Sequence, residues 1–414
     1  MEVRQSRLCY LNTTEPPDFV SNPATTTTPS VTDPQRRLRF GRNEWSGAFG
    51  DMGTDLPLLV GMILASGLDA TSVLTVFGLM QIATAIRYRI PMPVQPLKAM
   101  AAIVIAQKLP ANVLYGGGLA IGISMLVLSA TGMIEWINRV VPKPVVRGIQ
   151  CGLGLQLAGI ALRDYVQADG VRGLWLAGLG FVVTVVLIGR RRIPSAVILV
   201  ALGVVYAAAL KLDGSALTGA IGFHLPNFHR PAAADVWTGF LILALPQIPL
   251  SIANSVLATR QLSEDLFPAK QTTARGIAWT YAAMNLINPF VGGVPTCHGS
   301  GGMAGHYAFG GRTGGSVVIY GAMYVLLGAL FGPGFQTVIQ VFPLPILGVL
   351  LLFEAITLLA LLRDLSERRM DFLIAVLVGV IASSLPYGYL VGLLIGMLCT
   401  HLSRRGLTRL GAEG

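Results

Sequence analysis

The sequence has few charged residues and few cysteines for its length. Asp, Glu, Lys and Arg make up 12% of the 414 residues, whereas hydrophobic residues make up 53%. That composition excludes an ordinary soluble domain and indicates a polytopic membrane protein. The four cysteines are scattered, and three lie inside apolar runs, so no disulfide framework is expected.

Motifs for catalysis and for metal or phosphate binding are also missing. The pattern GxxxxGK[ST] is absent, which excludes a P-loop. Cys297, His298 and His306 lie close in sequence, but their spacing matches no recognised ligand set, so no metal and no other cofactor is expected. The sequence also shows no nucleophile–base pair of the kind that would indicate an integral-membrane enzyme. We therefore expect a protein that is not an enzyme.

Apolar runs, by contrast, fill most of the chain. A helix needs about 20 apolar residues to cross a bilayer. If two short, interrupted runs are counted (the third and the tenth), the sequence predicts an all-α membrane protein with fourteen passes. They lie near residues 45–64, 70–86, 91–107, 112–134, 144–162, 172–188, 194–210, 235–258, 274–292, 294–309, 314–331, 336–361, 371–385 and 387–401.

The net charge of +10 follows the same pattern. With the N-terminus inside, most Lys and Arg residues fall in the loops on the cytoplasmic side, as the positive-inside rule requires. This distribution explains the basic character without a nucleic-acid partner. We expect an integral protein of the plasma membrane, in contact with the lipid bilayer and with both termini in the cytoplasm.

Three pairs of motifs recur in the same order at a nearly constant offset. VPKPVVRG (from Val141) matches FPLPILGV (from Phe342), PVQPLKAMA (from Pro93) matches PTCHGSGGMA (from Pro295), and DLPLLVG matches QIPLSIAN. Each half has seven passes, an odd number, so the halves are inverted repeats. The predicted organisation is a disordered cytoplasmic tail (1–43), a first repeat (44–212), an extracellular connecting loop (213–233), a second repeat (234–402) and a cytoplasmic tail (403–414).

The third and tenth passes contain matching breaks. Pro91, Pro93 and Pro96 hold one backbone extended before a short helix over about 97–107. In VPTCHGSGGMAG (residues 294–305) the chain is extended through Pro295 before a helix from about 301 to 309. Two half-helices from opposite sides would bring their N-termini together at the midplane, where free N–H groups suit an anion.

Lys98 would add a full positive charge to this site, because a lone lysine within a membrane segment usually has a function. Gln95, Thr296, His298 and Ser300 would add neutral donors. Two alternatives stay open. The glycines could serve close helix packing, and Lys98 could pair with Asp51, Asp55 or Glu354.

Four stretches resemble signature sequences of the molybdate transporter family, a branch related to the SulP sulfate permeases. They are FGDMGTDLPLLVGM, IPMPVQPLKAMAA, LPQIPLSIANSVLAT and VPTCHGSGGMAGHYAFGGRTGGS. The resemblance implies a fourteen-helix inverted-repeat fold, with a core domain (passes 1–4 and 8–11) that carries substrate against a gate domain (5–7 and 12–14). It also implies that the C-terminal STAS domain of sulfate permeases is absent.

The resemblance further implies a secondary transporter that imports molybdate. The implied substrate-binding residues are Thr54, Gln95, Lys98, Gln247, Asn254, Cys297, His298, Gly299 and Ser300. Asp51, Asp55 and Glu354 are the candidates for coupling or gating, because the eighth pass has no carboxylate at mid-membrane depth. Sulfate or another tetrahedral oxyanion is the alternative substrate, and a nucleobase permease of the same fold is a more distant alternative function. A homodimer is also possible.

Overall fold

A computed structural model describes residues 37–134, 136, 140–187, 195–210, 221–270, 272–385 and 387–405. The described chain is almost entirely helical. Its first half contains α1 (Arg42–Ala48), α2 (Met52–Ser66), α3 (Ala70–Tyr88), β1 (Val94–Pro96), α4 (Lys98–Gln107), α5 (Ala111–Thr131), α7 (Lys143–Gly159), the π-helix η2 (Ile160–Tyr165), α8 (Gly170–Leu187) and α9 (Ser195–Leu210).

The second half contains the remaining elements. They are α10 (Ala233–Gly239), η4 (Phe240–Ala244), α11 (Leu245–Leu250), η5 (Ser251–Leu257), α12 (Ala258–Leu266), α13 (Ala274–Ile287), η6 (Asn288–Val291), β2 (Thr296–His298), α14 (Ser300–Ala308), α15 (Gly315–Val341), α16 (Leu344–Ala360), η7 (Leu361–Leu365), α17 (Arg369–Ser384) and α18 (Gly388–Arg404). The segments η4 and η5 are π-helical, and η6 and η7 are 3-10 helices.

Within the described residues, seven helices are long and apolar enough to cross a membrane, and α1 with α2, bent by 41°, would make an eighth. Large apolar side chains remain exposed on them. On α8, for example, Val171, Trp175 and Val182 are all exposed. Exposed apolar surface of this extent requires a lipid environment, so this is an integral membrane protein.

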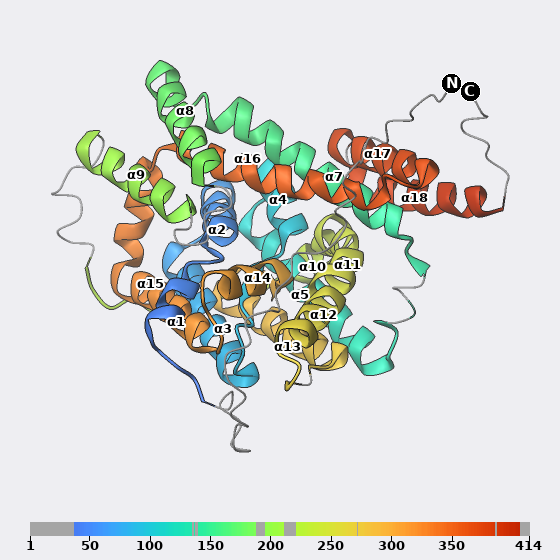
Figure 1. The fold of residues 1–414 in the computed structure, drawn as a ribbon, viewed down its shortest axis with the longest axis horizontal. Helices are drawn as coiled ribbons and strands as arrows, with labels where there is room; N and C mark the ends of the chain where they lie inside the picture. The colour runs from blue at the N-terminus through green and yellow to red at the C-terminus, as the bar shows by residue number, and fades with distance from the viewer. Residues whose placement is uncertain are drawn as a thin grey trace, which may run out of the picture.

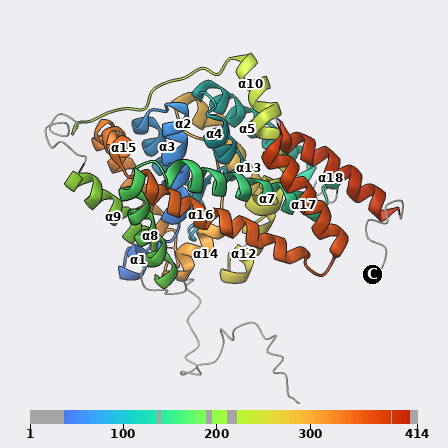
Figure 2. The same cartoon turned by 90° about the horizontal axis from the view of Figure 1, so that it is seen from above.

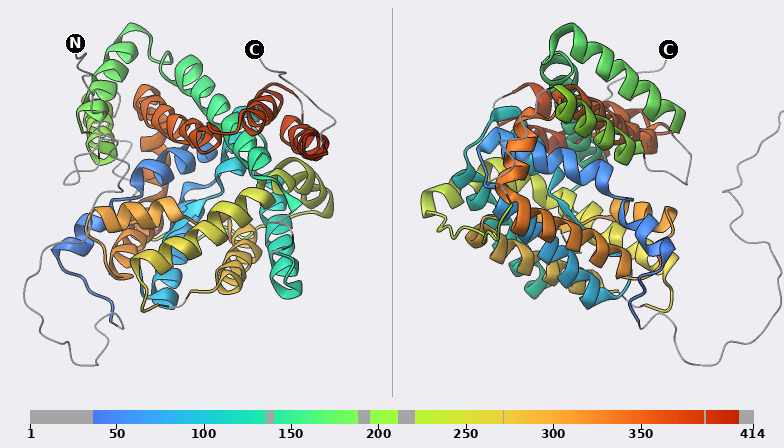
Figure 3. Two further views of the ribbon diagram at one scale, coloured as in Figure 1. Left: turned by 45° about the vertical axis from the view of Figure 1, so that its right-hand side comes forward. Right: turned by 90° about the vertical axis from the view of Figure 1, so that its left-hand side faces the viewer.

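The helices form two groups. Helices α7, α8, α9, α16, α17 and α18 lie together along one side of the molecule (Figure 1) and form a separate layer above the rest when the molecule is turned (Figure 3). Helices α1 to α5 and α10 to α15 form the other group, in which α3 packs along α15 and α5 packs along α13. Viewed from above, α16 crosses the middle of the molecule (Figure 2), where it contacts α7, α8 and α2.

The two breaks predicted from the sequence meet inside the second group. Strands β1 and β2 pair antiparallel, with Gln95 opposite Cys297. Each strand leads directly into a short helix. The expected ranges 97–107 and 301–309 correspond to α4 at Lys98–Gln107 and α14 at Ser300–Ala308.

Side-chain amides satisfy the outer edges of this two-stranded sheet. Gln81 on α3 donates to the carbonyl of Val94 at 2.7 Å and accepts from its N–H at 2.8 Å. Asn285 on α13 makes the same pair of bonds to Thr296, at 2.6 and 2.9 Å. Non-helical backbone is tolerated at membrane depth only when its polar groups are bonded within the protein, and these two amides meet that condition.

The start of one predicted pass is wrong. We expected one pass to end near residue 331 and the next to begin near 336. The chain does leave helical geometry at Phe331 (φ −136°), but a helical segment then continues through Pro333 to Val341, and the next long helix, α16, begins only at Leu344. Proline can kink a helix without ending it. The real stop lies at Pro343, which begins α16 in an extended conformation.

Candidate functional site

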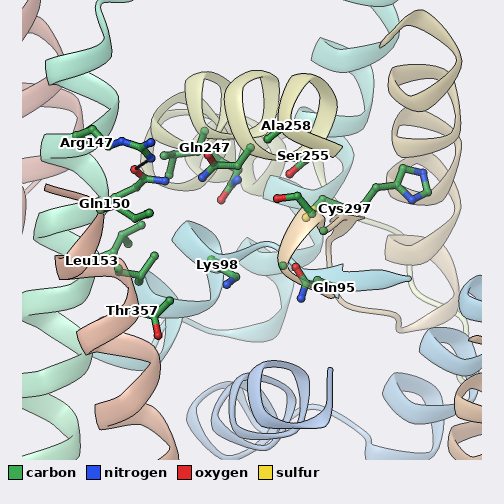
Figure 4. A pocket seen from close by; sticks show the side chains of 18 residues that line it. Gln95, Lys98, Arg147, Gln150, Leu153, Gln247, Ser255, Ala258, Cys297 and Thr357 are labelled. Atoms are coloured by element: carbon green, nitrogen blue, oxygen red, sulfur yellow. Dashed lines mark hydrogen bonds between the residues drawn. The ribbon is translucent and has the colours of Figure 1, made fainter. Parts of the chain in front are cut away.

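A cavity of about 300 Å³ lies between the two helix groups. One wall consists of residues from β1, α4, α11, η5, β2 and α14, and the other of residues from α7 and α16. In Figure 4, Gln95 and Cys297 lie on one side, Arg147, Gln150 and Thr357 lie on the other, and Lys98 lies between them. At about 30 Å³ per water molecule, the space accommodates a small hydrated ion.

The two half-helix N-termini present different surfaces to this cavity. At α4, the side-chain oxygen of Gln247 accepts from the backbone N–H groups of Ala99 and Met100, at 3.0 and 3.3 Å. At α14, Gly299 precedes the helix and makes no side-chain cap, and Ser300 and Gly301 line the cavity. The free helix end that faces the cavity is therefore that of α14, whereas we expected both ends to be free.

Lys98 forms an ion pair. Its Nζ lies 2.5 Å from Oε1 of Glu354 on α16. Glu354 also accepts a hydrogen bond from the hydroxyl of Thr54 at 3.4 Å. Of the carboxylates considered from the sequence, Glu354 is thus the direct partner, and the ion pair links the two helix groups across the cavity wall.

The glycines after Cys297 have three different surroundings. A Cβ atom on Gly299 would lie 1.8 Å from Oε1 of Gln95, and one on Gly302 would lie 2.2 Å from Oδ2 of Asp51. A Cβ on Gly305 would meet the backbone of Gly50 at 2.4 Å. Only at Gly301 is there open space. Packing therefore explains most of these glycines, and Gly301 is the one beside the cavity with room for a ligand.

Comparison with known proteins identifies the family. A family profile described as "Molybdate transporter of MFS superfamily" matches residues 43–157 and 239–358, more than half of the chain. Molybdate transporter 2 of Arabidopsis thaliana is 34% identical over 88% of this chain and 89% of its own length. This chain belongs to the molybdate transporter family. It is therefore a membrane transporter and not an enzyme.

Other members and solved structures agree with this assignment. Molybdate transporter 1 of Arabidopsis thaliana is 33% identical over 84% of this chain and 86% of its own. The transmembrane domain of the cyanobacterial bicarbonate transporter BicA aligns with a TM-score of 0.64 at 15% identity, over 88% of this chain and 98% of that one. Murine Solute Carrier 26 family member A9 aligns with a TM-score of 0.67 at 12% identity, over 89% and 69%. These two likenesses show a shared helical membrane-transporter fold.

Most of the predicted binding residues of this molybdate transporter family member border the same cavity. They are Gln95, Lys98, Gln247, Asn254, Cys297, His298, Gly299 and Ser300. The π-helix η5 carries Asn254 to the cavity wall, and within the described residues its amide forms no side-chain hydrogen bond. Thr54 does not line the cavity and instead bonds Glu354.

Two polar residues have structural partners. The His298 ring is fully buried and forms a 2.7 Å hydrogen bond with the hydroxyl of Thr280 on α13. Thr296 accepts from the amide of Asn288 at 3.0 Å. Both side chains hold the second break in place. A direct contact between His298 and substrate stays a prediction.

Arg147 and Gln150 on α7 border the cavity, and the sequence did not single them out as binding residues. The guanidinium of Arg147 donates to Gln150 at 2.9 Å and also pairs with Asp364. From the sequence, Arg147 counted only as one more cytoplasmic charge. The sequence signal that could have identified Arg147 is its position. It lies one turn after the Pro-x-Pro motif that begins α7, and the same motif begins α16.

Proposed function

We propose that this protein is a secondary transporter that imports molybdate. The single observation that carries the proposal is the uncapped N-terminus of α14, which borders a cavity between two helix groups in a member of the molybdate transporter family. A helix N-terminus carries about half a positive charge and unpaired N–H groups, which suit an oxyanion. Asn254 and Ser300 add neutral donors, and Arg147, which is paired with Asp364, adds a guanidinium on the opposite wall.

The location of the cavity suggests how the cargo would move. Residues on α4 and α14 face residues on α7 and α16 across it. If the group that contains α4 and α14 slides against the other group, the anion is exposed first to one side of the membrane and then to the other. This arrangement supports elevator-like alternating access of a core (α1–α5 and α10–α15) against a gate (α7–α9 and α16–α18).

The fine topology is part of the same proposal. We infer fourteen passes as two inverted repeats, 44–212 and 234–402, joined by an extracellular loop (213–233) and flanked by cytoplasmic tails (1–43 and 403–414). The antiparallel pairing of β1 with β2 supports inversion, and so do the Pro-x-Pro starts of α7 and α16, whose capping prolines are both extended. The plasma membrane is the proposed location.

Uptake into liposomes tests the function directly. Purified protein is reconstituted, radiolabelled molybdate is supplied outside, and sulfate is added in excess as a competitor. We expect saturable molybdate uptake that sulfate inhibits weakly. If sulfate is transported in preference, the protein is a sulfate transporter of the same fold, and if neither anion enters, the proposal is wrong.

A further inference from the structure

Four titratable side chains form a cluster behind the cavity, which we call the buried cluster: Asp51, Asp55, Lys98 and Glu354. Asp51 and Asp55, one turn apart at the start of α2, are 2% and 0% exposed, and Glu354 is 9% exposed. Asp51 Oδ1 accepts from Nε2 of Gln95 at 2.6 Å. Lys98 and Gln95 both line the cavity, so a single side chain, that of Gln95, separates Asp51 from the proposed anion site.

The charges of the buried cluster do not balance. Three carboxyl groups lie near one amine, and the N-terminus of α2 adds only about half a positive charge. Lys98 is already paired with Glu354. Two neighbouring carboxylates in a site with little water cannot both be ionised at low cost. The pair Asp51–Asp55 therefore lacks a positive partner.

The unsatisfied oxygens of the two aspartates indicate what is missing from the buried cluster. Asp51 Oδ2 and Asp55 Oδ1 are buried and have no donor among the described residues. Because the two residues lie one turn apart at the start of α2, a hydrogen held between their carboxyl groups would satisfy both of these oxygens. Two carboxyl groups can bond each other only when one of them holds a hydrogen. We propose that Asp51 and Asp55 share one proton, and that this proton is bound together with the transported anion.

The other groups around the pair do not supply that hydrogen. Tyr320 on α15 donates to Asp55 Oδ2 at 3.2 Å, and its hydroxyl also bonds Tyr324 at 3.1 Å. His306 on α14 packs edge-on against Tyr320, with Nδ1 3.1 Å from the hydroxyl of Ser316. Cys297 on β2 lies beside the cavity, and a cysteine side chain brings no positive charge. Each of these groups is neutral or already bonded, so none offsets the second aspartate.

A metal ion is a poorer fit than a proton. Within the described residues, no group of three or more His, Cys, Asp or Glu side chains is placed to hold one. Gly302 of α14 also packs directly on Asp51 Oδ2, which leaves no room for a coordination shell there. A hydrogen between two oxygens needs no additional space.

The proximity of the pair to the cavity sets the sign of coupling. This step rests on the proposed function. An oxyanion at the N-terminus of α14 would be repelled by ionised Asp51 and Asp55, and a proton on the pair would remove part of that repulsion. By linkage, anion binding must then raise the proton affinity of the pair by the same factor. Proton and anion would thus bind together and move inward together.

The first test needs no substrate. Infrared difference spectra of the apoprotein, titrated from neutral to alkaline pH, report the C=O stretch of a protonated carboxyl group. We expect a band in the wild type that Asp51→Asn and Asp55→Asn both remove. Asp235→Asn is the matched control, because that carboxylate lies on α10 and bonds Asn112, so the band should survive. A wild-type protein without the band overturns the shared proton, whatever its cargo.

The second test measures coupling in the wild type. Molybdate is titrated calorimetrically in two buffers of different ionisation enthalpy, whose comparison gives the protons taken up per anion. We expect uptake of up to one proton, and affinity that falls at least 10-fold from acidic to alkaline pH. Binding without proton uptake overturns the coupling and leaves the transport proposal intact. Absence of binding at every pH refutes the transport proposal, while the infrared result still decides the shared proton.

Uptake assays then distinguish transport coupled to protons from transport coupled to sodium ions. A pH gradient, acidic outside, should drive molybdate accumulation equally well in sodium and in choline salts. Asp51→Asn combined with Asp55→Asn should keep molybdate exchange between the two sides but lose accumulation driven by the gradient. Accumulation that needs sodium and ignores pH would contradict the proposal.

Discussion

At the scale of single residues, Lys98 has a different role from the one its sequence position indicated. An isolated intramembrane lysine beside a helix end would be a direct anion ligand. Its 2.5 Å contact with Glu354 makes it one half of an ion pair across the cavity wall. The sequence named Glu354 as one of three partners, but only the tertiary packing of α16 on α2 selects it.

Substitution of Lys98 separates the two roles. Loss of one member of a buried ion pair costs about 3–5 kcal/mol. Lys98 is 31% exposed, so solvent screening should reduce this to about half. We expect Lys98→Met to lower the melting temperature of the purified protein, and Lys98→Met combined with Glu354→Gln to restore it.

Molybdate binding by the double variant then decides the matter. If Lys98 touches the anion, the double variant should stay about 10- to 100-fold weaker, because a charged hydrogen bond contributes about 1.5–3 kcal/mol. Wild-type affinity in the double variant would show that the lysine only neutralises Glu354.

At the scale of elements, the half-helices were predictable almost to the residue, because proline and glycine mark their starts locally. The capping of α4 by Gln247 could not be predicted from the sequence, because it depends on how α11 packs against α4. The same holds for Gln81 and Asn285, which are unremarkable amides in apolar helices until the folded chain places them beside β1 and β2. Local sequence signals therefore predict where the helices are interrupted, whereas the side chains that bond the interrupted backbone depend on long-range contacts.

Adjacent glycines of α14 provide a matched pair of variants. Gly301→Val would place its side chain in open space beside the cavity, whereas Gly302→Val would collide with Asp51 and Pro93. We expect Gly301→Val to fold normally and lose at least 10-fold in molybdate affinity. Gly302→Val should lower the melting temperature. Normal binding by a folded Gly301→Val protein would refute the site at the N-terminus of α14.

The side-chain amides that cover the sheet should matter for stability and not for binding. Asn285→Leu leaves two backbone groups of Thr296 without partners, and each buried unsatisfied group costs about 1–3 kcal/mol. We expect a clear fall in melting temperature by fluorescence-detected size exclusion. Gln261→Ala, which removes an exposed amide on α12 that bonds Asp265, should cause almost none.

At the scale of the whole molecule, the helices lie in two groups with a cavity between them, which the sequence alone could not show, and the assignment of these groups as core and gate stays a prediction. The topology can be tested in a protein whose native cysteines are replaced. A cysteine at Ala168 should react with an impermeant reagent added outside intact cells, and one at Ser366 should react only after permeabilisation. Reaction of both from the same side would contradict the inverted repeats.

The pairing of β1 with β2 also has a consequence for how the protein is made. Ribosomes add about 5–20 residues per second, so β1 emerges on the order of 10 s or more before the strand that completes its hydrogen bonds. During that interval Gln81 can cover one edge of β1, but the other edge stays bare. The newly made first half should therefore be held by the insertion machinery, or by a membrane chaperone, until Thr296–His298 arrives.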